Sequence, residues 1–154
     1  MSSKTKNARG RAPQRVILLV DDDASVRELI GRVLVDEGYS VWLAANGDEA
    51  LNTVASKPID LVLLDLNMPG LGGWDIYEKL TTENPLLAVI IITAKPNQLF
   101  TSLGAGVGAL LEKPFDFPVL LQTVKNLLAE PAERRLARLT GRQAEFHYRP
   151  SAKP

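Results

Sequence analysis

Aspartates directly follow two apolar runs, and they are the first sign of chemistry in this sequence. The run VILLV leads into Asp21, Asp22 and Asp23, and the run LVLL leads into Asp65. Two carboxylates about 5 Å apart repel each other by roughly 3 kcal/mol at an effective dielectric constant near 20. A hard divalent cation among the acids would offset this cost, and an all-oxygen site of this kind suits Mg²⁺. The acids therefore predict a magnesium site.

A hydroxyl group and an ammonium group follow two further apolar runs. Thr93 ends the run AVIII, and Lys113 comes directly after ALLE. In open α/β sheets, functional sites form beyond the carboxyl ends of the strands, where the strand order reverses. Taken singly, Asp23 is a helix cap and each of the others is an ordinary surface or turn residue. Taken together at successive strand ends, these residues predict one site where acids, a threonine and a lysine converge.

Short apolar runs alternate with stretches of helical periodicity through the middle of the chain. Periodicity and turn residues predict strands at 16–20, 41–45, 60–65, 87–92 and 108–112, and helices at 24–37, 47–56, 73–84, 98–106 and 116–128. Five βα units in succession predict the α/β class, with a doubly wound, five-stranded parallel sheet flanked by five helices.

Composition limits the class of protein. The chain has 154 residues, 45% of them apolar, and no cysteine, which excludes disulfides, thiolate chemistry and cysteine metal sites. No apolar run is long enough to cross a bilayer, and the residues before Val16 lack the apolar stretch of a signal peptide. We therefore expect a cytoplasmic protein without a membrane partner.

The charges divide the chain into three segments. Residues 1–15 carry five basic and no acidic residues, residues 131–154 carry six basic and two acidic ones, and residues 16–130 have a net charge of −9. This predicts a disordered basic tail at 1–13, one domain at 14–130, and a basic extension at 131–154 that is partly helical or disordered. Neither end is expected to supply core residues. The basic ends are interpreted as solubilising segments, and no specific DNA binding is expected.

Four motifs in order resemble those of a known family. The segments VDDD, LLDLNMPG, IITA and KPF are similar to the corresponding segments of the receiver domain of two-component response regulators, and the resemblance covers about residues 14–130. It implies a flavodoxin-like sheet with strand order 2-1-3-4-5 and a peptide bond before Pro114 that is commonly cis. Only 24 residues follow 130, too few for an effector domain, so a stand-alone receiver is expected.

The resemblance also implies a role for each residue of the site. Asp65 would be the phosphoacceptor, Thr93 would hydrogen-bond the phosphoryl group, and Lys113 would pair with it. The implied ligands of Mg²⁺ are Asp65, Asp22 directly, Asp21 through water, and the backbone carbonyl of Asn67.

The implied function is that of a phosphoacceptor signalling module. It would accept a phosphoryl group from a histidine kinase or a histidine phosphotransfer protein and signal by contact with a downstream protein, with a weak dimer allowed. It would not be an enzyme, although it would assist its own phosphotransfer and dephosphorylation. One alternative is a pseudo-receiver that binds partners without phosphorylation, which predicts a missing acceptor or lysine. The other is a haloacid-dehalogenase-like phosphatase, which would need an acid where Asn67 stands.

One position departs from the family pattern. Leu110, three residues before Lys113, occupies the place where receivers typically carry an aromatic switch residue. Because leucine has no ring to move between exposed and buried positions, we expect phosphorylation chemistry to be intact and signal transmission to be altered.

Overall fold

The apolar runs form the strands of one parallel sheet. The computed structural model describes residues 14–68, 72–95, 98–141 and 146–152. The strands are β1 (Val16–Val20), β2 (Ser40–Ala44), β3 (Leu61–Asp65), β4 (Ala88–Thr93), β5 (Ala109–Glu112) and β6 (His147–Arg149), and the helices are α1 (Ala24–Asp36), α2 (Gly47–Ser56), α3 (Gly73–Glu83), α4 (Leu99–Ala105), α5 (Phe117–Leu128) and α6 (Ala132–Leu139).

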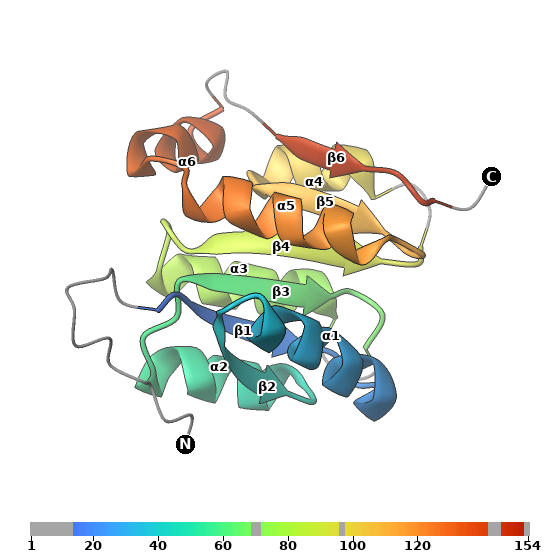
Figure 1. Cartoon of the computed structure of the whole chain (residues 1–154). Helices are drawn as coiled ribbons and strands as arrows, with labels where there is room; N and C mark the ends of the chain where they lie inside the picture. The colour runs from blue at the N-terminus through green and yellow to red at the C-terminus, as the bar shows by residue number, and fades with distance from the viewer. Residues whose placement is uncertain (1–13, 69–71, 96–97, 142–145, 153–154) are drawn as a thin grey trace, which may run out of the picture.

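Alternate residues of each strand pack against different helices. Figure 1 shows α1 and α5 in front of the sheet and α2, α3 and α4 behind it. Ile17 and Leu19 of β1 belong to the core cluster under α1 and α5, whereas Leu18 and Val20 belong to the cluster on the other face. All of β1, β3 and β4 is buried, as expected for parallel strands covered on both sides.

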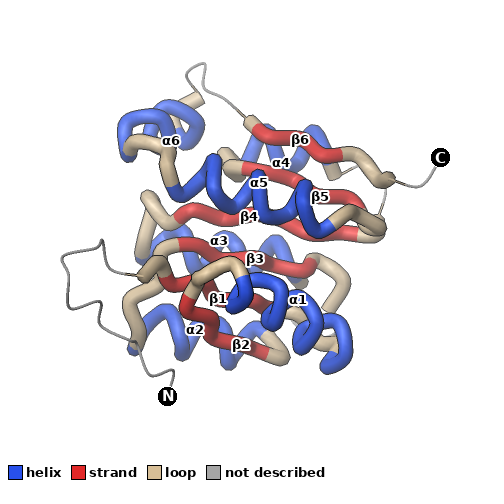
Figure 2. The backbone as a smooth tube through the Cα atoms, in the orientation of Figure 1, coloured by secondary structure: helices blue, strands red, loops and turns tan. Residues whose placement is uncertain are grey.

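The strand order brings β1 and β3 together at the centre of the sheet. The order is β2-β1-β3-β4-β5-β6, with every pair parallel (Figure 2). From β1 the chain adds β2 on one side, and it then adds β3 and the later strands on the other side, so the strand order switches between β1 and β3. Because parallel strands end at the same side of the sheet, the residues that follow β1, β3, β4 and β5 meet there. The predicted α/β fold and its strand order are confirmed.

The extension after 130 differs most from expectation. A five-stranded sheet was predicted, but a sixth strand, β6, pairs with β5 in parallel, and α6 precedes it. The expectation that this end supplies no core residues was wrong, because Phe146 and Tyr148 pack against the core cluster behind the sheet. The predicted disordered tail at 1–13 lies outside the described residues.

Among the residues that the structure describes, no helix is both long and apolar enough to span a membrane.

Candidate functional site

Three carboxylates lie together beyond the ends of β1 and β3. Ligand oxygens of Asp21, Asp22 and Asp65 lie within 4.8 Å of one another. Asp21 and Asp65 are each only 2% exposed, whereas Asp22 is exposed to solvent. An all-oxygen cluster with one solvent-facing member fits a hard divalent cation that keeps part of its water shell.

Lys113 is the cation that the fold itself supplies to this cluster. Its Nζ atom donates to Oδ2 of Asp65 at 3.1 Å and lies 3.9 Å from Oδ2 of Asp21. The lysine follows β5, and its backbone amide donates to the carbonyl oxygen of Thr93 at 2.8 Å, which ties its position to the end of β4. The next peptide bond, Lys113–Pro114, is cis, as the family resemblance implied.

Thr93 lies at the end of β4 and is fully buried. Its hydroxyl donates to Oδ1 of Asn67 at 3.2 Å and accepts from the amide of Lys95 at 2.9 Å. The amide of Asn67 in turn donates to Oδ1 of Asp65 at 2.8 Å. A chain of hydrogen bonds therefore joins the acid on β3 to the threonine on β4.

Each predicted site residue is found at this side of the sheet. Asp23 is not one of the three clustered carboxylates; it caps α1 by accepting from the amides of Ser25 and Val26. This confirms its interpretation as a helix cap.

Arg27 was missed in the sequence. From the first turns of α1, its Nη1 atom donates to the carbonyl oxygen of Asp21 at 2.6 Å. The signal available was its spacing: a basic residue four positions after the cap Asp23 lies on the first turn of the helix that follows the acids. The guanidinium fixes the backbone of the turn that presents Asp21.

Burial raises the pKa of Asp21 above its usual value of 3.8, and the charge of Asp65 adds to this effect. The amide of Asp23, which donates to Asp21 at 2.9 Å, and the ammonium of Lys113 act in the opposite direction. A raised pKa in the folded state means that the stability contribution of Asp21 is present below 3.8 and is lost as pH rises through the folded pKa. The ionised, metal-free site is therefore a source of instability at neutral pH.

Asp21→Asn is accordingly expected to raise the unfolding midpoint of the metal-free protein. The amide oxygen can still accept from Asp23, while the negative charge beside Asp65 is removed. The gain over wild type should grow as pH rises above 3.8 and level off once the wild-type carboxyl is ionised in the folded state as well. Urea denaturation in the presence of a chelator measures it. A gain that does not depend on pH would contradict the electrostatic origin.

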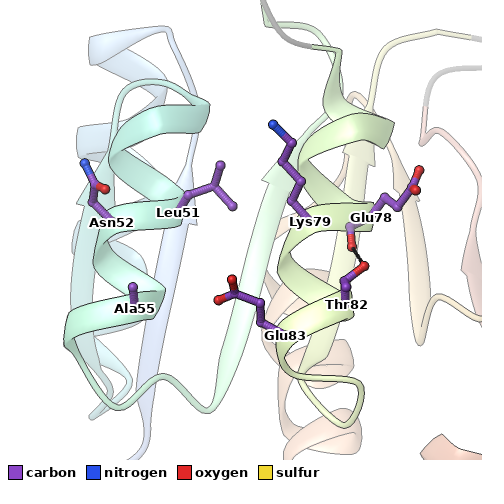
Figure 3. Close-up of a pocket in the computed structure, with 7 residues that line it drawn as sticks. All are labelled: Leu51, Asn52, Ala55, Glu78, Lys79, Thr82 and Glu83. Carbon is purple, nitrogen blue, oxygen red and sulfur yellow. Dashed lines mark hydrogen bonds between the residues drawn. The ribbon is translucent and has the colours of Figure 1, made fainter.

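A surface pocket lies elsewhere, between α2 and α3. Figure 3 shows the residues that line it: Leu51, Asn52, Ala55, Glu78, Lys79, Thr82 and Glu83. None of the clustered carboxylates borders this pocket, so its lining residues take no part in the site at the strand ends.

Comparisons with known proteins identify the family of this chain. A family model for the response regulator receiver domain matches residues 17–125. Response regulator MprA of Mycolicibacterium vanbaalenii is 40% identical over 114 residues, which are 73% of this chain and 49% of that relative. MprA of Mycobacterium avium is also 40% identical over 114 residues, with 73% and 50% covered. The chain thus spans about half the length of the curated relatives it matches.

Solved structures share the fold over most of the chain. A CheY-like response regulator receiver domain protein from Methanospirillum hungatei superimposes with a TM-score of 0.74 and 31% identity, covering 79% of this chain and 98% of that one. Response regulator TrrA from Thermotoga maritima, solved in complex with Mg²⁺-BeF, gives a TM-score of 0.69 and 33% identity, covering 74% and 99%.

Proposed function

Because this chain belongs to the response regulator receiver domain family, we propose that it is a phosphoacceptor signalling module whose acceptor is Asp65. The observation that carries the proposal is the contact of the buried Asp65 carboxylate with Lys113, beside two further acids. An acceptor, a cation and a divalent-metal ligand set in one place are the parts that phosphoryl transfer to a carboxylate requires.

The proposed reaction needs no general base. A carboxylate is already a nucleophile at neutral pH. One oxygen of Asp65 forms a bond to phosphorus as the bond between phosphorus and the histidine nitrogen of the donor breaks, and the electron pair stays on that imidazole, which takes up a proton. Before the reaction, Lys113 donates a hydrogen bond to one oxygen of the Asp65 carboxylate. During the transfer it pairs with the incoming phosphoryl oxygens.

The residues present fit a bound Mg²⁺. The carboxylates of Asp21, Asp22 and Asp65, with the backbone carbonyl of Asn67, would hold it. The ion supplies positive charge that offsets the approach of two anions. Thr93, whose hydroxyl now donates to Asn67, would turn this hydroxyl toward the phosphoryl group.

The proposed partners are a histidine kinase or histidine phosphotransfer protein upstream and a protein target downstream. The module is proposed to be no enzyme in its own right, beyond assisting its own phosphorylation and dephosphorylation.

Four further expectations stay predictions: the stand-alone organisation, the weak dimer, the absence of specific DNA binding and the cytoplasmic location. The pseudo-receiver alternative is disfavoured because both the acceptor and the lysine are present and in contact.

The full chain is expected to become phosphorylated when incubated with acetyl phosphate and Mg²⁺. Labelling should fall at least about tenfold when the metal is chelated, because charge neutralisation is then lost. Intact-mass spectrometry follows the adduct, and borohydride reduction followed by peptide mapping identifies the modified aspartate. Equal labelling with and without a divalent metal, or a label on another residue, would refute the proposal.

A further inference from the structure

The extension after residue 130 is anchored to the domain at the amino end of β5. The guanidinium of Arg138 forms a two-pronged ion pair with the carboxylate of Glu130, and Arg135 donates to the carbonyl oxygens of Leu127 and Leu86. A β-carbon at Gly106 would lie 3.1 Å from Cδ2 of Leu139, so α6 packs closely on the loop before β5. Beyond α6, β6 lies beside β5 and parallel to it (Figure 1).

The segment 146–152 then follows β5 toward the candidate site. In the parallel register, Tyr148 lies beside Leu110, and both pack behind the sheet. An aromatic ring from the extension thus stands next to the leucine that replaces the expected aromatic residue.

Polar contacts of this segment reach both neighbours of Lys113. The hydroxyl of Tyr148 donates to Oε1 of Glu112 at 2.9 Å, and the amide of Ser151 donates to the same oxygen at 3.3 Å. The amide of Ala152 donates to the carbonyl oxygen of Pro114 at 2.9 Å. The residues before and after the lysine are therefore both held by the extension.

We propose that the segment 146–152 regulates the phosphoacceptor site by positioning Lys113 through Glu112 and Pro114. Tyr148 and Glu112 are positioning residues, because neither touches Asp65. This inference rests on the proposed function. When Lys113 pairs with a phosphoryl group rather than with Asp65, the end of β5 that carries it shifts. The hydrogen bonds that the segment makes to Glu112 and Pro114 then change as well. By linkage, docking of the segment changes the free energy of phosphoryl-group binding at the site by as much as that binding changes the free energy of segment docking.

Tyr148→Phe tests this coupling in the full chain. It removes the hydroxyl but keeps the ring beside Leu110. With saturating acetyl phosphate and Mg²⁺, the first-order rate of labelling should fall several-fold, because a displaced Lys113 stabilises the charge of the transferring phosphoryl group less well. Glu112→Ala should reproduce this loss, and Glu112→Gln should keep the wild-type rate because its amide oxygen still accepts. The double variant that combines Tyr148→Phe with Glu112→Ala should be no slower than Glu112→Ala alone, because Glu112→Ala already removes the acceptor of the Tyr148 hydroxyl, together with that of the Ser151 amide.

Tyr77→Phe is the matched control. Its hydroxyl donates to the carbonyl oxygen of Ala105, the last residue of α4, at 2.8 Å, so the same chemical deletion is made away from Lys113. Its labelling rate should equal that of wild type. If Tyr148→Phe labels at the wild-type rate, or if Tyr77→Phe slows labelling equally, positioning of Lys113 by the segment is refuted.

Hydrogen exchange provides a second readout that a merely structural role would not change. Addition of Mg²⁺ and beryllofluoride should alter the exchange of amides 147–152 in wild type and much less in Tyr148→Phe. Unchanged exchange in wild type would overturn the coupling even if the site is phosphorylated. Failure of wild type to take label at all would instead overturn the proposed function, so the two failures are distinguished.

Discussion

Replacing Asp65 by asparagine is expected to reduce phosphorylation of the chain to background. Asparagine has the shape of aspartate, and its side-chain oxygen can still accept from the amide of Asn67, so the turn after β3 is retained. It has no anionic oxygen to attack phosphorus. The loss therefore reports on the nucleophile rather than on the fold. Labelling by acetyl phosphate in the presence of Mg²⁺, followed by intact-mass spectrometry, measures it.

Asp23→Asn is the control for this substitution. It makes the same chemical change at the neighbouring strand end, but asparagine caps a helix about as well as aspartate, so both stability and labelling should be retained. A label that persists in Asp65→Asn would show that another residue is the acceptor. Loss of label in both variants would show that total charge at this side of the sheet, rather than one nucleophile, decides the reaction.

Lys113→Met is expected to give the largest change in stability among site variants. The substitution leaves the buried carboxylates of Asp65 and Asp21 without their ammonium partner. Breaking a fully buried ion pair costs about 3–5 kcal/mol, but the lysine side chain is 27% exposed, so about 1–3 kcal/mol is expected here. Urea denaturation of the metal-free protein measures the loss.

Added Mg²⁺ should then stabilise Lys113→Met more than wild type. The carboxylates that lack the ammonium bind a cation more tightly, and a ligand that binds only the folded state stabilises it further as its affinity rises. Lys79→Met, at an exposed position on α3, should change neither the stability nor the response to the metal by more than about 0.5 kcal/mol. A Lys113→Met protein as stable as wild type without metal would mean that the acids are solvated and do not need the pair.

The central elements were predictable because burial leaves a strong pattern. β1, β3 and β4 are continuous apolar runs, since strands covered on both faces have no solvent side to interrupt them. The positions of Asp21, Asp65, Thr93 and Lys113 follow from the same rule, because each residue directly follows or ends such a run. Parallel pairing then brings them to one side of the sheet without any further information.

The extension was not predictable in the same way. β6 has three residues, His147, Tyr148 and Arg149, all half-buried, and neither alternation nor an apolar run marks it. Its strand conformation comes from pairing with β5 and not from its own preferences. The role of Arg27 was missed for a related reason, since its partner is the backbone of Asp21, and a backbone acceptor leaves no mark in a sequence.

The presence of β6 also changes how this sheet meets other chains. Without it, the outermost strand on that side would be β5, an apolar strand of the sequence ALLE with a full row of backbone donors and acceptors turned outward. Such a border recruits strands from neighbouring molecules and promotes aggregation. With it, the border is a three-residue strand that carries a histidine and an arginine, too short and too polar to template further pairing. The extension therefore also protects the protein against association through its sheet, and release of β6 carries the risk of aggregation.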